Sequence, residues 1–152
     1  MTPDRSMPSS ATPAVKVVLD TNVLVSGLLN AKGPPSRLVD LVLAGVIEPV
    51  LSAEILEECR CVLSRKELGL PPARVGALLE FLDEFALPLP VPTEDVCPDP
   101  EDAKFLASAI EGGAQWLVTG NIRYYPASPY RGVVLLNPAE AERRLLNVCF
   151  TG

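Results

Sequence analysis

The sequence predicts an α/β fold in which a parallel sheet has helices on both of its faces. Short apolar runs alternate with segments whose apolar residues recur at helical spacing, and the first run, residues 15–19, is rich in valine. A strand that is buried on both faces has this composition. Alternating strands and helices are typical of a parallel sheet built with right-handed crossovers.

The first half of the chain predicts two helices on either side of a second strand. Ser36 is suited to cap a helix whose apolar residues end at Gly45. Residues 46–51 form the second apolar run, and Ser52 is then the predicted N-cap of a helix that runs to about Ser64.

The third strand is predicted at an edge of the sheet. It follows a helix over about residues 72–85, which has apolar residues at helical spacing. The extended segment 87–92 then has proline at positions 88, 90 and 92. Because backbone N–H groups two residues apart point to the same side of a strand, the three missing donors fall on one side, where no neighbouring strand can pair.

Two further strands and two helices complete the predicted domain. They are a helix over residues 100–111, strands over 116–119 and 133–136, and a last helix over 138–146. With the proline-rich segment at the edge, the fold class is predicted as a three-layer α/β/α domain with a five-stranded parallel sheet of order 3-2-1-4-5. Residues 1–14 are rich in Pro, Ser and Thr and predict a flexible tail before this single domain over 15–152.

Length, composition and charge narrow the class of protein. The 152 residues suffice for one domain with a core, and no apolar run approaches the roughly 18 residues of a membrane span. The four cysteines lack a Cys-x-x-Cys pair and the chain has no histidine, so we expect reduced thiols in a cytoplasmic protein rather than a zinc site. A net charge of −6 argues against binding nucleic acid by phosphate contacts alone, but carboxylates that hold divalent cations also make a sequence acidic.

Asp20 is the most conspicuous polar residue, because it closes the first strand. The fourth strand ends in Thr119-Gly120-Asn121, and the predicted strand order brings both segments to the topological switch point, where open α/β sheets bind ligands. Asp20 fits the N-cap of the following helix equally well. Thr119 and Asn22 are likewise suited either to orient ligands or to form turns.

A cluster of acids opens the helix over residues 100–111. Asp99 fits its N-cap, and acids in the first turn complement the helix dipole, so all of them have a structural interpretation. Asp102, however, shares its side of the helix with the apolar residues that face the sheet. Burying a carboxylate there is costly without a cation, which favours a ligand role for Asp102 and leaves Glu101 in solvent.

The helix after Ser52 contains a further candidate carboxylate. Glu58 lies three residues after Ile55 and four before Val62, at the border of the apolar face, whereas Glu57 lies on the exposed side. Glu58 is therefore the better candidate, with a surface salt bridge as the ordinary alternative for any helical Glu.

Four of these segments follow one another along the chain. Four motifs in a fixed order are far more specific evidence for a family than any single motif. They read Val-Val-Leu-Asp-Thr-Asn-Val-Leu-Val-Ser (17–26), Leu-Ser-Ala-Glu-Ile-Leu-Glu-Glu (51–58), Asp-Pro-Glu-Asp-Ala-Lys-Phe-Leu-Ala-Ser-Ala (99–109) and Leu-Val-Thr-Gly-Asn (117–121). Together they resemble the successive motifs of PIN-domain ribonucleases, in particular the toxins of bacterial and archaeal toxin–antitoxin pairs. The resemblance covers about residues 15–146.

This resemblance implies cleavage of single-stranded RNA that depends on Mg²⁺ or Mn²⁺. The acids that it assigns as metal ligands are Asp20, Glu58, Asp99 and Asp102. Asn121 takes the place of the fourth family acid; its carbonyl oxygen can coordinate a cation but brings no charge, which leaves the occupancy of a second metal site open. The implied reaction is in-line attack on the phosphodiester by metal-activated water, and it requires no protein base.

Three functions remain as hypotheses. The leading one is a cytoplasmic metal-dependent endoribonuclease, the toxin partner of a separate antitoxin chain, which we expect to form a homodimer. The second is a non-catalytic PIN module that binds RNA or a protein. The third is a phosphoryl-transfer enzyme with Asp20 as nucleophile; it is disfavoured because Asp20-Thr21-Asn22 lacks a second Asp and no lysine follows the fourth strand.

Several basic and aromatic side chains are candidates for contact with RNA. Arg123, Lys104 and Arg37 are suited to contact phosphate. Tyr124 and Tyr125 are suited to stack on unpaired bases, or else to pack in the core or an interface.

Overall fold

The computed structural model describes residues 14–87 and 100–151 of the chain. Four strands form its main sheet: β1 (Val15–Leu19), β2 (Ile47–Pro49), β5 (Trp116–Val118) and β6 (Val134–Leu136). They pair in parallel in the order β2-β1-β5-β6. The prediction of an α/β fold with a parallel sheet is confirmed.

The predicted second strand is divided in the structure. After β2 and Val50 the chain forms β3 (Leu51–Ser52), which pairs in parallel with β4 (Ala86–Leu87). The Val50 N–H still donates to the Val17 carbonyl at 2.9 Å, so the chain separates from β1 directly after Val50. Pro49 has no N–H to donate to a ladder, which favours a break at this point. Among the described residues the strands thus form a four-stranded and a two-stranded sheet, and the predicted five-stranded order 3-2-1-4-5 stays a prediction.

The described part of the third strand is short. β4 begins at Ala86, one residue before the predicted extended segment. The prolines at 88, 90 and 92, which predict an edge strand, lie outside the described residues, as do residues 1–13 of the predicted tail.

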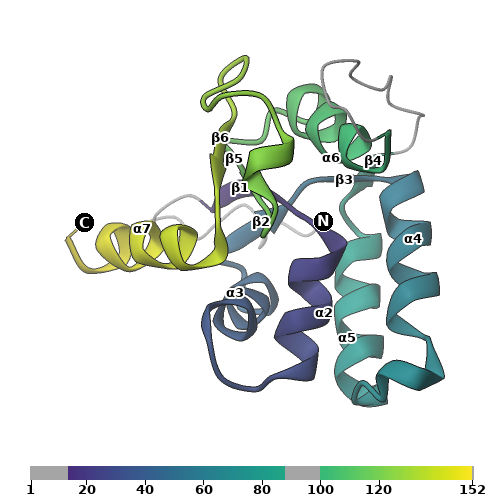
Figure 1. The fold of residues 1–152 in the computed structure, drawn as a ribbon. Helices are drawn as coiled ribbons and strands as arrows, with labels where there is room; N and C mark the ends of the chain where they lie inside the picture. The colour runs from purple at the N-terminus through teal and green to yellow at the C-terminus, as the bar shows by residue number, and fades with distance from the viewer. Residues whose placement is uncertain (1–13, 88–99, 152) are drawn as a thin grey trace, which may run out of the picture.

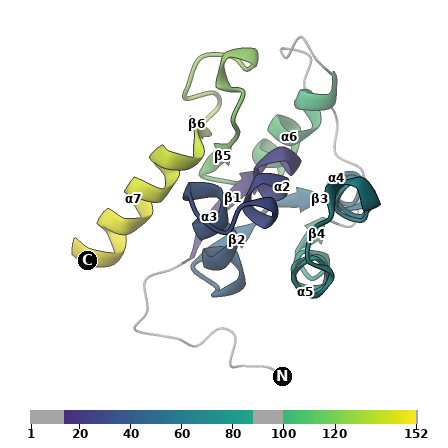
Figure 2. The same cartoon turned by 60° about the horizontal axis from the view of Figure 1, so that its bottom comes forward.

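Helices cover both faces of the sheet (Figure 1). Their bounds are Thr21–Leu29 for α2, Pro34–Leu43 for α3, Ala53–Leu63 for α4, Pro72–Asp83 for α5, Pro100–Glu111 for α6 and Pro138–Thr151 for α7. α6 lies on one face and contacts β1, β3 and β5. α2 and α3 lie side by side on the other face (Figure 2), where α2 also contacts α4. None of the described helices is both long and apolar enough to span a membrane.

Local sequence signals account for most of the helix ends. The Ser52 hydroxyl accepts a hydrogen bond from the Ile55 N–H at 3.2 Å, which confirms Ser52 as the N-cap of α4. α6 begins and ends where the sequence predicts. The predicted start of α3 is wrong: the helix begins at Pro34 after Gly33, because proline fits the first helical turn, and Ser36 is buried inside it.

The hydrophobic core is continuous through the layers. Fully buried side chains come from the two central strands, from α3 and from α6; they include Val17, Val18, Leu38, Val39, Leu106 and Leu117. The core thus packs α6 against β1 and β5. α2 begins just after β1, at the end of the sheet where the candidate site residues lie.

Gly27 allows α2 to approach α3 closely. A Cβ atom at Gly27 would lie 2.7 Å from the Pro35 carbonyl oxygen and 2.7 Å from Val39 Cγ2, whereas one at Gly76 in α5 would meet nothing within 4 Å. We expect Gly27→Ala to lower the free energy of unfolding by about 1–3 kcal/mol through overpacking. Gly76→Ala should raise it by about 0.4–1 kcal/mol, because alanine restricts the unfolded chain. Urea unfolding of the two variants measures both changes, and changes of the same sign would contradict this packing.

Candidate active site

Asp20 is buried between the ends of the two central strands. Its backbone N–H donates to the Val118 carbonyl at 3.0 Å, and the residue is only 4% exposed. One carboxylate oxygen accepts from the Asn22 N–H at 3.0 Å, which caps α2. The other accepts from the Thr119 hydroxyl at 2.9 Å. Asp20 is therefore the predicted helix cap, and one of its oxygens also faces the end of β5.

Thr119 orients this second oxygen. Its side chain is fully buried, and its hydroxyl accepts from the Asn121 N–H at 3.0 Å while it donates to Asp20. The sequence predicts either a turn-forming or an orienting role for Thr119. The hydroxyl has both roles, since it forms the turn after β5 and orients the Asp20 carboxylate. Asn121, half-buried, begins the short helix η2 (Ile122–Tyr124) without a side-chain capping bond.

Glu58 reaches the same region from α4. Its carboxylate accepts from the Thr21 hydroxyl at 2.7 Å, and Thr21 directly follows Asp20. The other carboxylate oxygen forms an ion pair with the ammonium of Lys104 on α6. Three segments far apart in the sequence, namely the end of β1, α4 and α6, are thereby joined. Glu57 is exposed, as predicted from its helix face, and contacts Arg60 at 3.9 Å.

The acids at the start of α6 are described only in part. Asp102 is half-buried and makes an interaction of its own. Asp99 and the side chain of Glu101 lie outside the described residues. Within the described part of the chain, no three acidic, cysteine or histidine side chains are grouped closely enough to hold a metal ion. The complete ligand set therefore stays a prediction.

The environment of Asp20 nevertheless fits a divalent cation. Its buried carboxylate accepts one hydrogen bond on each oxygen, and residues 14–87 and 100–151 provide it with no cationic partner. Burying an unpaired carboxylate is costly, and Mg²⁺ favours carboxylate oxygens of this kind. Glu58 joins this region from α4 through the Thr21 hydroxyl.

Two side chains proposed from the sequence as phosphate contacts have other partners. Lys104 is buried and pairs with Glu58, and the exposed Arg37 pairs with Glu142 of α7. The sequence feature that indicates burial of Lys104 is the apolar run that follows it in α6. A helix that is apolar on nearly all sides is buried, so a lysine within it needs an internal partner.

Cys59 lies directly behind this site. Its sulfur is 3.8 Å from the Thr21 hydroxyl, and burial raises the pKa of its thiol to about 11, whereas Cys61 is exposed. Because the thiolate is the nucleophile, we expect iodoacetamide at pH 8 to alkylate Cys61 in the folded protein and to leave Cys59 unmodified. Cleavage after Arg60 places the two on different tryptic peptides, which mass spectrometry can quantify. Equal labelling before unfolding would contradict the burial of Cys59.

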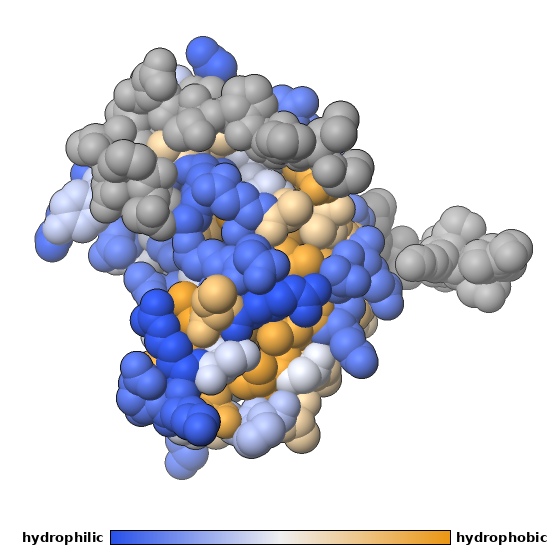
Figure 3. All heavy atoms as spheres, turned by 90° about the vertical axis from the view of Figure 1, so that its right-hand side faces the viewer, coloured by the Kyte–Doolittle hydropathy of each residue, from blue (hydrophilic) through white to orange (hydrophobic). Residues whose placement is uncertain are grey.

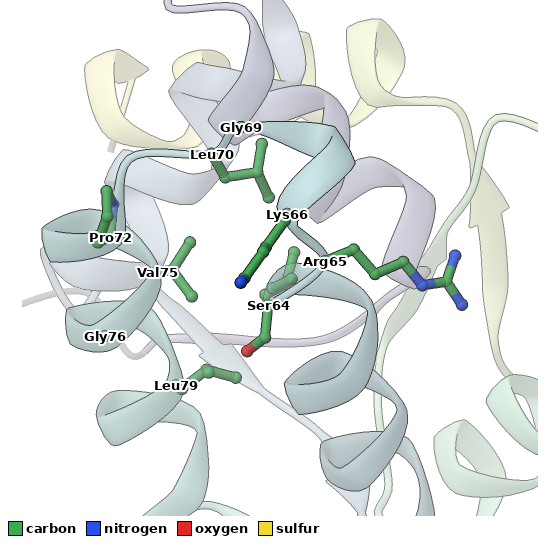
Figure 4. A pocket seen from close by; sticks show the side chains of 10 residues that line it. Ser64, Arg65, Lys66, Gly69, Leu70, Pro72, Val75, Gly76 and Leu79 are labelled. Carbon is green, nitrogen blue, oxygen red and sulfur yellow. The ribbon is translucent and has the colours of Figure 1, made fainter.

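A pocket of about 550 Å³ lies apart from these residues. It is formed by the end of α4, the short helix η1 (Lys66–Leu68) and the start of α5. Its walls include Leu70 and Val75, and the side chain of Lys66 extends into it (Figure 4). Figure 3 shows the face that carries α4 and α5, on which hydrophobic side chains are visible between hydrophilic ones. None of the predicted site residues lines this pocket.

Fold and site together define a class of α/β domains that place acidic side chains at the switch point of a parallel sheet. The PIN domain family matches residues 16–123, a range that contains all five predicted site residues. The chain belongs to the PIN domain family, whose members are typically nucleases and generally depend on divalent metal ions.

One relative of the chain is an uncharacterized protein of Methanocaldococcus jannaschii. The two are 34% identical over 111 residues, which cover 70% of this chain and 71% of the relative. No solved structure matches the chain.

Proposed function

We propose that the protein is a metal-dependent endoribonuclease that cuts single-stranded RNA. The observation that carries this proposal is the buried carboxylate of Asp20, oriented by Thr119 and without a cationic partner in the described residues. Asp20 would hold the cation together with Asp102, Asp99 and Glu58. Such a cation activates water and stabilises charge on the phosphoryl oxygens, so the absence of histidine is no obstacle.

The residues after β5 favour an unpaired strand as substrate. Tyr124 is 46% exposed, and the Arg123 guanidinium carbon lies 5.3 Å from the centre of its ring. Both lie in η2, the short helix that begins after Asn121. An exposed tyrosine with a neighbouring arginine is suited to stack on a single-stranded base and contact its phosphate. Tyr125 is buried and packs in the core.

The biological role that we propose is that of a toxin. It rests on the resemblance of the four motifs to toxins of toxin–antitoxin pairs, and it implies a homodimer in the cytoplasm that a separate antitoxin chain inhibits. A neighbouring reading frame for a small protein with a DNA-binding head and a disordered tail would support it. Induced expression should arrest growth, and arrest by the Asp20→Asn variant would contradict a nuclease-based toxin.

The substrate can be tested with matched oligonucleotides. Purified protein should cleave a fluorescent single-stranded RNA with Mg²⁺ or Mn²⁺, act much more slowly on the same sequence as a duplex or as DNA, and stop with excess chelator. Preferential cleavage of duplex or DNA would overturn the substrate class. Cleavage unchanged by the chelator would overturn the mechanism.

The second candidate function, a non-catalytic binding module, is favoured by the neutral Asn121 at a position that is acidic in the family pattern. Asn121→Asp adds a negative charge and should tighten Mn²⁺ binding or raise the cleavage rate if Asn121 is a weak ligand. A titration of both proteins with Mn²⁺ measures binding and cleavage together. Tighter binding without cleavage by either protein would favour the binding module. A loss of cleavage on adding the acid would show that Asn121 acts as a hydrogen-bond donor.

A further inference from the structure

The pocket between α4, η1 and α5 has a lining that suits an aliphatic ligand. Its volume of about 550 Å³ lies within the range of roughly 300–1,000 Å³ that is usual for small-molecule sites. Its apolar walls include the side chains of Leu63, Leu70, Val75 and Leu79. None of the described residues that line it is aromatic, so an unpaired base would find no ring to stack on. The pocket is therefore not suited to the proposed RNA substrate.

The polar groups at the pocket favour an anion. Its described lining contains two cations, Arg65 and Lys66, and no acid, although the whole chain has a net charge of −6. The Lys66 ammonium and the Ser64 hydroxyl point toward the space between the walls, whereas the Arg65 side chain extends away from it (Figure 4). In the described part of the chain, no ion pair involves Lys66. A charged donor and a hydroxyl are thus available to the acidic head of a ligand.

Gly76 leaves one wall of the pocket open. It lies inside α5, where glycine is less favourable than alanine. A Cβ atom at this position would meet nothing within 4 Å, so packing among the described residues does not require a glycine. A ligand that occupies the space would account for both the open wall and the cation that points into it.

We propose that this pocket binds a small aliphatic anion, whose hydrocarbon body packs against the apolar walls and whose acidic head lies beside Lys66 and Ser64. The site is separate from the candidate active site, and the proposal does not depend on the proposed function. The ordinary alternative is a lysine that only covers apolar surface with its stem. Selectivity for the charge of the ligand's head distinguishes the two.

The test is a titration of the metal-free full chain with octanoate, followed through the backbone amide signals in ¹H–¹⁵N NMR spectra. Octanoate should shift the amides of residues 63–79 and leave those of the candidate active site unchanged. It should bind about fivefold more tightly than octanamide, the neutral probe of the same length, which is the upper end of the range for an exposed ion pair. Lys66→Gln should remove this preference, whereas Lys32→Gln, at an exposed position outside the pocket, should keep it.

A second variant tests the open wall. Gly76→Leu should weaken octanoate binding at least about tenfold, because the new side chain takes the place of the hydrocarbon that would be buried there. Ala77→Leu makes a similar change at the next residue, which is exposed and does not line the pocket, and should bind octanoate as wild type does. Melting temperatures show whether both variants fold, and if Gly76→Leu does not, the comparison with Lys66→Gln decides alone.

Three outcomes would overturn the proposal. The first is equal affinity for octanoate and octanamide, or a preference that persists in Lys66→Gln. The second is binding by folded Gly76→Leu at the affinity of wild type. The third is a spectrum in which octanoate leaves residues 63–79 unshifted; shifts of these residues by a leucine-rich acidic peptide would then identify a protein interface instead.

Discussion

Asp20→Asn is expected to reduce RNA cleavage by more than about 100-fold. Replacing a residue that only orients a metal ligand costs about 10–100-fold, and loss of a ligand itself should cost more. The reason is that asparagine keeps the size of the side chain and its ability to cap α2 but removes the negative charge that would hold the cation. In metal-free buffer the melting temperature should stay equal or rise, because a buried charge is removed.

The control for this variant is Asp83→Asn, the same change at an exposed residue. Asp83 pairs with Arg60 across the surface of α4 and α5 at 3.2 Å, and an exposed pair of this kind contributes little to stability. Its cleavage rate should equal that of wild type. If Asp20→Asn lost activity only because it unfolded, circular dichroism and the melting temperature would reveal it, and the ligand role would then be unsupported.

Glu58→Gln is expected to impair both stability and cleavage, in contrast to Asp20→Asn. It leaves the buried ammonium of Lys104 without its carboxylate, which should lower the free energy of unfolding by about 2–3 kcal/mol. This is below the range for fully buried pairs, because a quarter of the Glu58 side chain is exposed. The positive charge of Lys104, which Glu58 no longer offsets, also opposes a cation at Asp20, so cleavage should fall at least about tenfold.

Glu57→Gln is the matched control on the neighbouring residue. Its side chain is 73% exposed, and its contact with Arg60 lies on the surface, so we expect stability and cleavage close to wild type. Urea unfolding and initial rates on the same RNA measure both variants. If Glu57→Gln abolished cleavage and Glu58→Gln did not, the assignment of the helix face would be wrong.

The parts of the fold that local signals determine were predictable from the sequence. Ser52 caps α4 because its hydroxyl reaches a free N–H in the first turn, and the bounds of α6 follow from Pro100 and the glycines after Glu111. The start of α3 was missed because Ser36 resembles a cap, whereas two prolines already fit the turn before it. The division of the second strand depends on the partners of Val50 and Leu51, which no local pattern specifies.

At the site, the sequence predicts residues whose positions follow from a strand end or a helix face. It does not predict pairs of residues that meet only in the folded chain. Asp20 follows from the end of the first apolar run, and Glu58 from its place at the border of the apolar face. The ion pair between Glu58 and Lys104 joins residues 46 positions apart on different helices, so spacing alone does not reveal it. Its indirect signal is a lysine that directly precedes the apolar run of α6.

The central claim is that a divalent cation at Asp20 enables cleavage of RNA. The most direct measurement is a Mn²⁺ titration of the metal-free protein in the presence of fluorescent single-stranded RNA, with bound Mn²⁺ and initial rate recorded at each concentration. We predict no cleavage without metal, a rate that rises in proportion to the occupied fraction, and a return to zero on adding excess chelator. A rate that is independent of bound Mn²⁺, or cleavage that persists in excess chelator, would contradict the claim.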